Sequence, residues 1–223
     1  MNLERRVGVI VGTLLLAQMA GSALVNFGLQ APLFGDPGFL ANAAPHAQQI
    51  GLSALIGIAV GAIFGGIAIT IFPIVLAHSQ TMALWLLLFG AAVFAIAVVE
   101  QASVMSMVTM SEAYLKAPAA AQDQFQTLRV VVAAARNWPH FLARMMDGVA
   151  GFLFFATLAR FALVPRVLAA AGLLAAAMQI TGLAMPLFGH DVVFALLAPM
   201  GLVQLALALW LLVKGFRRAS DSI

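Results

Sequence analysis

The sequence contains no cysteine and few charged residues, and each scarcity excludes a class of protein. Without cysteine the chain has no disulfide, no zinc–thiolate site and no thiol nucleophile. Charged residues make up 9% of the chain and hydrophobic residues 64%, whereas a soluble domain has about 25% and about 45–50% respectively. A water-soluble fold cannot cover so much apolar surface with so few charges. The composition therefore predicts an integral membrane protein.

Six apolar windows are long enough to cross a bilayer, which takes about 20 mostly apolar residues. These windows predict an all-α fold in which residues 1–223 form a single domain of six transmembrane helices. An alternative for the first window is a cleaved signal peptide, because Arg5 and Arg6 precede it, but its apolar run is longer than a typical signal core. The windows cover residues 7–29, 51–75, 83–107, 139–161, 165–185 and 192–214.

The basic residues lie mostly on one side of these windows, so the net charge of +3 does not indicate a nucleic-acid-binding patch. With the N-terminus inside, seven Lys and Arg residues fall in inner segments and three in outer segments, and Arg144 lies within a window. The positive-inside rule then predicts that both termini are cytoplasmic. The inner residues are Arg5, Arg6, Arg160, Arg166, Lys214, Arg217 and Arg218, and the outer ones Lys116, Arg129 and Arg136.

The outer connection between the third and fourth windows, residues 111–138, has an amphipathic pattern. It predicts a helix that lies on the outer membrane interface and bends at Pro139 into the fourth span. The alternative is one long tilted helix over residues 125–161, whose first turns leave the membrane. The apolar stripe comprises Phe125, Leu128, Val132 and Ala135, and the polar stripe Gln122, Gln126, Arg129 and Arg136.

Small residues recur every fourth position in the second window, at Ser53, Gly57, Gly61 and Gly65. Such a ridge lets another helix approach closely, so that dispersion contacts replace the missing hydrophobic drive in lipid. The ridge predicts a helix-packing surface. The partner helix lies either in the same bundle or in a second copy or another subunit.

Polar side chains within the windows concentrate in the outer half of the membrane. Glu100 lies in the third window, and His140, Arg144 and Asp147 share one face of the fourth at i, i+4 and i+7. Glu100 and Arg144 have similar depth on antiparallel neighbours, which predicts that Arg144 pairs with Glu100, Asp147 or both. Because buried charges in hydrocarbon usually face a partner or a cavity, we expect an outward-facing polar pocket between spans one, three, four and five.

This pocket predicts a protein that binds, senses or helps to transport a small molecule or lipid. Arg144 would hold an anionic group, Glu100 and Asp147 would balance its charge, and His140 would respond to pH at the mouth. The polar groups stop near the midplane, which disfavours a channel. Three alternatives remain open: an ion pair that only fixes helix register, an assembly subunit that associates through the glycine ridge, and an enzyme of the outer leaflet.

No catalytic residue, metal site or cofactor is predicted. His140 and Asp147 lie two turns apart, too far for the aspartate to orient the histidine, and the chain has no G-x-S-x-G or H-E-x-x-H motif. Met105, Met107 and Met110 offer thioethers to Cu(I), but methionine is also an ordinary filler of apolar helix faces. The expected partners are membrane lipids and a small ligand, with homo- or hetero-oligomers open and nucleic acid excluded.

Two C-terminal segments carry a resemblance to a known family. VPRVLAAAGLLAAAMQITG (164–182) enters an Ala- and Leu-rich helix through Pro-Arg, and LALALWLLVKGF (205–216) closes the last window. Together they resemble a bacterial six-span membrane family catalogued as domain of unknown function 4386. In that family a histidine often lies early in the fourth span, and His140 looks like its counterpart. The resemblance implies a multi-pass fold in a bacterial inner membrane, and it implies no activity.

Overall fold

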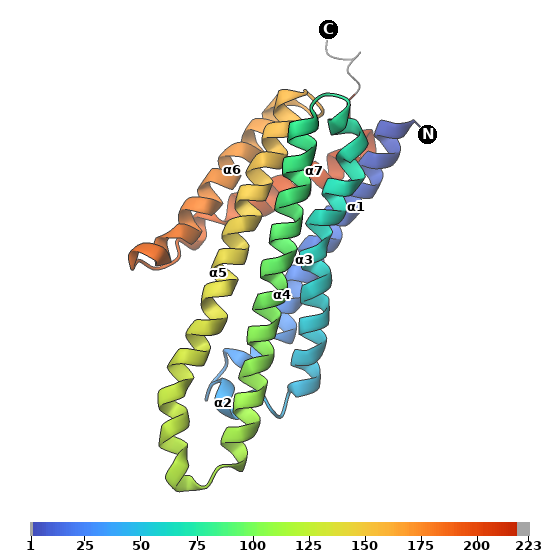
Figure 1. Cartoon of the computed structure of the whole chain (residues 1–223). Helices are drawn as coiled ribbons and strands as arrows, with labels where there is room; N and C mark the ends of the chain where they lie inside the picture. The colour runs from blue at the N-terminus through green and yellow to red at the C-terminus, as the bar shows by residue number, and fades with distance from the viewer. Residues whose placement is uncertain (1, 218–223) are drawn as a thin grey trace. The chain divides into compact units, whose positions relative to one another are not determined.

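The computed structural model describes residues 2–217, and every regular element among them is helical (Figure 1). A π-helical turn, η1 (Leu24–Leu29), continues the first helix. Arg218, one of the inner basic residues counted above, lies outside the described residues. The α-helices are α1 (Leu3–Ala23), α2 (Phe39–Asn42), α3 (Ala47–Leu76), α4 (Gln80–Lys116), α5 (Gln122–Arg160), α6 (Arg166–Ala184) and α7 (Ala198–Lys214).

Six helical segments of residues 2–217 are long and apolar enough to cross a membrane. Each overlaps one of the six predicted windows, so the all-α, multi-pass fold is confirmed. Residues 77–79 alone separate α3 from α4, and residues 161–165 separate α5 from α6. The six segments are Leu3–Leu29, Ala47–Leu76, Gln80–Lys116, Ala119–Arg160, Arg166–Phe188 and Phe194–Lys214.

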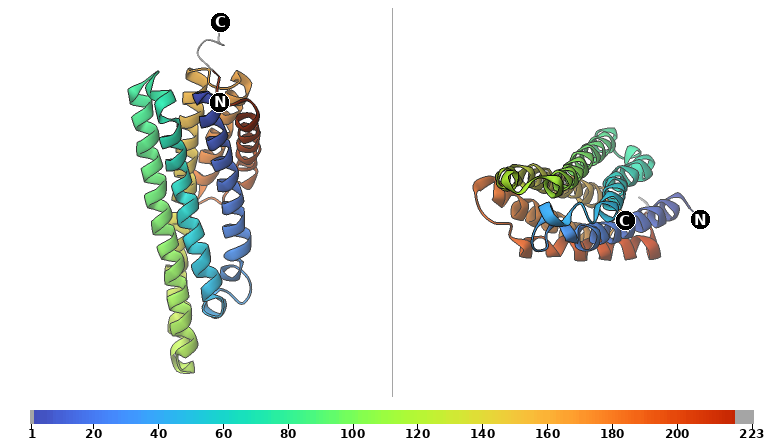
Figure 2. Two further views of the ribbon diagram at one scale, coloured as in Figure 1. Left: turned by 90° about the vertical axis from the view of Figure 1, so that its right-hand side faces the viewer. Right: turned by 90° about the horizontal axis from the view of Figure 1, so that it is seen from below.

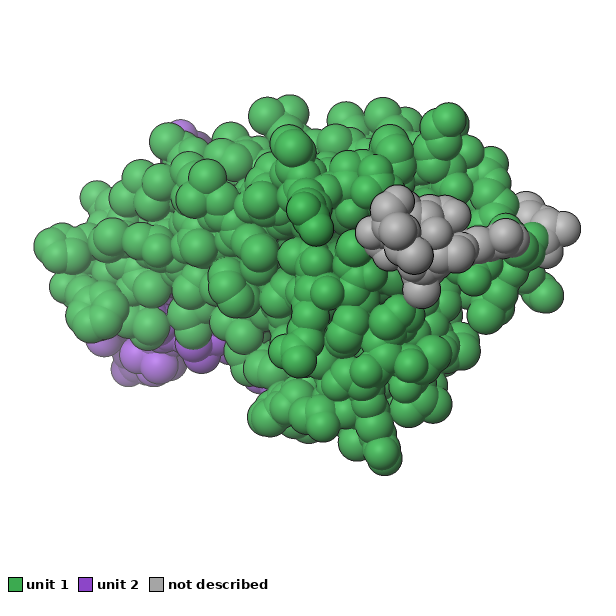
Figure 3. Space-filling view, turned by 90° about the horizontal axis from the view of Figure 1, so that it is seen from above, with its two compact units in different colours: residues 1–19, 62–94, 144–223 green, residues 20–61, 95–143 purple. Residues whose placement is uncertain are grey.

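The chain divides into two compact units, coloured in Figure 3. Four helices, α1, α3, α4 and α5, contribute residues to both units without a break. The prediction of a single domain stays a prediction. Among the described residues, unit 1 comprises 2–19, 62–94 and 144–217, and unit 2 comprises 20–61 and 95–143.

The core of unit 1 packs large apolar side chains directly onto glycines. Gly172 on α6 lies under the Phe155 ring of α5, where a Cβ atom would come within 2.0 Å of the ring. Gly12 on α1 lies against α7, where a Cβ atom would be 2.8 Å from the carbonyl oxygen of Ala208. Such close approach maximises the dispersion contacts that hold helices together in lipid. Other buried members of this core are Ile67, Ile71, Leu86, Leu158, Leu207 and Leu211.

The glycine ridge of α3 lies against α4, which passes beside α3 in Figures 1 and 2. In unit 2, Cβ atoms at Gly57 and Gly61 would meet Gln101 and Ala97 at 2.6 and 2.4 Å. In unit 1, Gly65 faces Gly90, at which a Cβ atom would lie 2.9 Å from the Gly65 Cα. The partner of the ridge is therefore a helix of the same chain. The alternative of an assembly subunit relied on this ridge as its contact with another chain, and the ridge is covered by α4 instead.

The predicted interfacial helix with a bend at Pro139 is wrong. Residues 122–160 form one continuous helix, α5, of 39 residues with Pro139 inside it. The alternative of a single long helix is the one that the structure has. Phe125 packs edge-on against Tyr114 at a centroid distance of 5.9 Å, and Val132 packs against the buried core of unit 2. The apolar stripe is thus covered in part by protein, so that no bend onto a membrane surface is needed.

Candidate functional site

The outer half of α4 presents a buried polar face to the rest of unit 2. Glu100 and Gln101 are each 4% exposed, and Val104, Met107 and Ser111 follow them on the same buried face. The spacing of three and four residues keeps these side chains on one side of the helix. Ser111 donates a hydrogen bond to the carbonyl oxygen of Leu40 at 2.8 Å. This face therefore mixes apolar packing with fixed polar contacts.

His140 on α5 pairs with Glu100 on α4. The Nδ1 atom of His140 lies 2.8 Å from the Glu100 Oε1 atom, within hydrogen-bond distance. The two side chains are 21% and 5% exposed, so the carboxylate is buried and the imidazole is only partly covered. In unit 2, residues 95–116 of α4 and 122–143 of α5 run antiparallel (Figure 1), which brings these two predicted residues together.

Arg136, one turn before His140, is a buried cation that the sequence prediction missed. It was placed on the polar, solvated stripe of the outer connection, but it is 5% exposed. Its Nη2 donates a hydrogen bond to the Gln30 Oε1 atom at 3.0 Å, and its guanidinium lies 4.8 Å from the centroid of the Phe34 ring. A signal existed in the sequence: Arg136 lies at i−4 from His140 and therefore shares its helix face.

Gln30 is fully buried because a π-helical turn places it there. The N–H of Gln30 donates to the carbonyl oxygen of Val25 at 2.9 Å, an i to i−5 bond in place of the α-helical i−4. In a regular α-helix the N–H of Leu29 would bond to Val25. The extra residue of the π-helical turn puts Gln30 in that position instead, next to buried Val25. Gln30 then donates through Nε2 to the Gln101 Oε1 atom at 3.3 Å. The resulting chain of contacts, Arg136–Gln30–Gln101, is defined here as the amide–arginine network.

Gly57 on α3 keeps the Gln101 amide in this network. A Cβ atom at residue 57 would lie 2.6 Å from the Gln101 Cδ atom, closer than van der Waals contact allows. We expect Gly57→Ala to displace the amide, break the Gln30–Gln101 hydrogen bond and lower the free energy of unfolding by about 1–3 kcal/mol. Thermal unfolding of the purified protein in detergent measures this loss.

Gly51→Ala is the matched control for this substitution, because it lies on the same helix and nothing lies within 4 Å of its added Cβ. Its expected effect is no loss, or a gain of up to about 1 kcal/mol from helix propensity. Equal unfolding temperatures for Gly57→Ala and the natural protein would show that Gln101 is not held by this close contact.

Arg144 and Asp147 form a second ion pair, in unit 1. Their side chains meet at 3.1 Å between Nη1 and Oδ2, at positions i and i+3 of α5. The predicted pairing of Arg144 with Asp147 is therefore present. Gln179 on α6 donates through Nε2 to the Arg144 carbonyl oxygen at 3.0 Å, which joins this turn of α5 to α6. The two charged side chains remain 28% and 17% exposed.

Comparison with protein families assigns the sequence to a known family. Residues 10–215 match the family described as domain of unknown function (DUF4386). The chain belongs to the DUF4386 family. The resemblance inferred from the two C-terminal segments is thus confirmed, and it extends over nearly the whole chain. Neither the comparison with curated proteins nor that with solved structures found a match.

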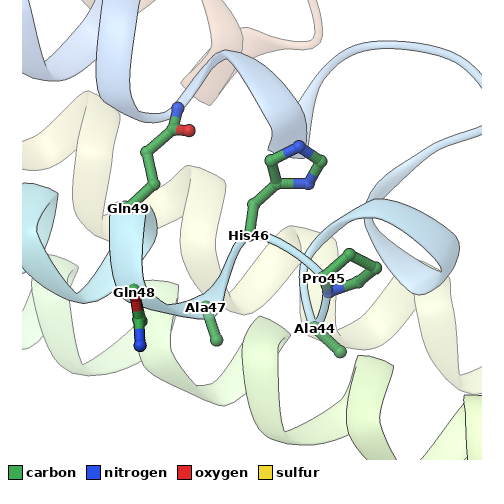
Figure 4. A pocket seen from close by; sticks show the side chains of 6 residues that line it. All are labelled: Ala44, Pro45, His46, Ala47, Gln48 and Gln49. Carbon is green, nitrogen blue, oxygen red and sulfur yellow. The ribbon is translucent and has the colours of Figure 1, made fainter.

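Two surface hollows of this DUF4386 protein lie away from the predicted residues. One, of about 430 Å³, is lined by residues 44–49 at the start of α3 (Figure 4). In it, His46 Nδ1 lies 2.8 Å from the carbonyl oxygen of Asn42, and Gln49 donates to the carbonyl oxygen of Leu29 at 3.1 Å. The other is lined by Thr81, Leu84, Trp85 and Leu88 on α4. The predicted functional residues line neither hollow.

Proposed function

We propose that this chain is a multi-pass protein of the bacterial inner membrane that binds a small anionic molecule or an anionic lipid headgroup on its outer side. Both termini then lie in the cytoplasm, an orientation supported by the excess of Lys and Arg residues in the inner segments. The groups proposed to act in binding are Glu100, His140, Arg144 and Asp147. Charged side chains in spanning helices are expensive and usually serve a function.

The observation that carries this proposal is the contrast between two arginines on α5. Arg136 is 5% exposed and inside the amide–arginine network. Arg144, two turns further on, is 28% exposed and pairs with Asp147 on its own helix. Both contacts use a guanidinium, which holds carboxylate and phosphate groups through parallel hydrogen bonds. Because Arg144 retains an accessible surface and Arg136 does not, we assign anion binding to Arg144 and a structural role to Arg136.

In each unit one carboxylate balances its own cationic or imidazole partner when no ligand is bound. Asp147 contacts Arg144 at 3.1 Å, and an incoming anion competes with it for the guanidinium. Glu100 contacts His140 at 2.8 Å, and the partly exposed imidazole is the member of this pair that a ligand can reach. The proposed ligand is therefore an anion with two or more acceptor oxygens, as in a phosphate or a carboxylate.

Ligand stabilisation tests this proposal. The purified protein in a neutral detergent is unfolded by heat with added phosphatidylglycerol, phosphatidylethanolamine or inorganic phosphate. A ligand at 100 times its Kd stabilises the folded state by about 2.7 kcal/mol. We expect phosphatidylglycerol to raise the unfolding temperature and phosphatidylethanolamine to leave it nearly unchanged. A matching rise with inorganic phosphate identifies a free anion as sufficient, and its absence identifies the lipid headgroup.

The residue assignment is tested with Arg144→Gln, which we expect to remove the phosphatidylglycerol shift. Arg144→Lys keeps the charge but not the two-pronged geometry, and we expect it to reduce the shift. Arg166→Gln, at the exposed start of α6, is the control that keeps the shift. An unchanged shift in Arg144→Gln would refute the proposal, as would no shift with any probe. Failure of both Glu100→Gln and Arg144→Gln to fold would indicate ion pairs that only fix helix register.

A further inference from the structure

A belt of exposed apolar side chains covers the outward face of α4. From residue 84 to residue 105 every exposed residue is apolar, and the next exposed residues are Ser106, Thr109 and Glu112. At a rise of about 1.5 Å per residue this belt is about 32 Å long, close to the hydrocarbon thickness of about 30 Å. Its large members are Leu84, Trp85, Leu88, Phe94, Val98, Val99 and Met105.

A second apolar belt covers α5, and it begins before the predicted fourth span. From residue 130 to residue 159, a distance of about 44 Å, the only exposed polar residue is Asn137, whose Oδ1 accepts a hydrogen bond from Arg136. Before this belt the exposed residues turn polar, with Asp123, Gln124, Gln126, Thr127 and Arg129 accompanied by Leu128. The large apolar members are Val130, Val131, Trp138, Leu142 and Phe152.

The exposed apolar side chains of α5 stay on the same side of the helix before and after Pro139. Val131, Trp138 and Leu142 are spaced by seven and four residues, so they lie on one side of the helix. Arg136 and His140, which contact Gln30 and Glu100, lie on the opposite, inward side. The exposed face of α5 is therefore apolar on both sides of Pro139, the residue at which the sequence placed the start of the fourth span.

We infer that lipid acyl chains cover α5 from Val130 onward, so that the outer hydrocarbon boundary on this helix lies near Arg129 rather than at Pro139. The belt on α4 has about the length of the hydrocarbon core, and the belt on α5 is long enough to span it. In unit 2 their outer ends, Met105 and Val130, lie about three and two turns from the α4–α5 connection, which is a comparable level. Arg129 then lies where a cation meets lipid phosphates. This inference holds whether or not the protein binds a ligand.

The inference gives a reason for the burial of Arg136. Two turns inside the new boundary, an arginine cannot reach water on the lipid-facing side and must be satisfied by protein groups. Gln30 and Phe34 supply a carbonyl oxygen and an aromatic face. The amide–arginine network is thus an intramembrane feature, and the sequence window that began at residue 139 was too short at its outer end.

Spin labels on single cysteines test the boundary, because the natural chain has no cysteine to remove. Asp123→Cys, Val131→Cys and Leu142→Cys are labelled and reconstituted into vesicles of phosphatidylglycerol and phosphatidylethanolamine. Power saturation then compares collisions with oxygen, which concentrates in lipid, and with a water-soluble nickel chelate. We expect the oxygen-to-nickel ratio at residue 131 to match that at residue 142 and to exceed that at residue 123 several-fold.

Two results would overturn the inference. A label at residue 131 that collides with the nickel chelate as often as the label at residue 123 would show that this part of α5 stands in water. A label at residue 131 shielded from both reagents would show that protein covers the face, a second copy of the chain being the first partner to test. Ala143→Cys, at a position that is 1% exposed, sets the value for a shielded site.

Discussion

Arg136→Met is expected to lower the free energy of unfolding by about 2–3 kcal/mol, the typical worth of a hydrogen bond to a charged group in a buried setting. The methionine fills much of the volume of the arginine but donates no hydrogen bond. Gln30, which is fully buried, then loses the donor to its Oε1 atom. The contact with the Phe34 ring is lost as well. Thermal or denaturant unfolding of the detergent-purified protein measures the change.

Arg129→Met is the matched control, because Arg129 lies on the same helix two turns earlier and is exposed. Its expected effect is within about 0.5 kcal/mol of zero. The double variant Gln30→Leu/Arg136→Met removes the stranded acceptor together with its donor, so we expect it to lose less stability than the sum of the two single variants. Additive losses, or no loss for Arg136→Met alone, would show that the amide–arginine network contributes nothing as a unit.

Gly172→Ala is expected to destabilise the protein by about 1–3 kcal/mol, the usual cost of adding a methyl group to a filled core. The added Cβ would come within 2.0 Å of the Phe155 ring, which is 1% exposed and enclosed by the core of unit 1. Either the ring leaves its position or α6 moves away from α5. The unfolding temperature of the variant in detergent measures the effect.

A second substitution that removes the Phe155 ring tests whether this ring causes the loss of stability in Gly172→Ala. Phe155→Leu/Gly172→Ala removes the ring that the new methyl group meets, and we expect the double variant to be more stable than additive single losses predict. Gly201→Ala on α7, where nothing lies within 4 Å of the added Cβ, serves as the control and is expected to lose no stability. If the unfolding temperature of Gly172→Ala equalled that of this control, the space between α5 and α6 would be larger than the position of the Phe155 ring indicates.

The helices were predictable because their signal is local. Each span is a run of apolar residues long enough to cross the bilayer. Such a run can be recognised from the sequence alone, whichever helices pack against it. The pair Arg144–Asp147 was predictable for the same reason, since three residues along one helix fix its geometry. Glu100 and His140 were recognised as candidates because charged and titratable groups are rare in apolar helices. Their mutual contact was not predicted, because it depends on how α4 and α5 are aligned.

The outer connection shows where local reasoning failed. The amphipathic pattern of residues 122–136 was read correctly as helical, but the apolar stripe was assigned to a membrane surface. In the structure Phe125 and Val132 pack against protein, Leu128 is exposed, and Arg136 is buried. The helical period of a sequence shows which residues share a face of the helix, but not what packs against that face. Proline at residue 139 suggested a bend, yet α5 is continuous through it.

The sequence by itself determined the class of protein, the six candidate spans and the family. Hydrophobicity, charge placement and short motifs decide these, and all are properties of neighbouring residues. Only the tertiary structure decided which polar and charged side chains meet across helices. Gln30 and Arg136 are 106 positions apart, and their contact needs the π-helical turn after α1, the close approach of α3 to α4 at Gly57, and the alignment of α4 with α5. Those three conditions arise from packing in space, which no local pattern encodes.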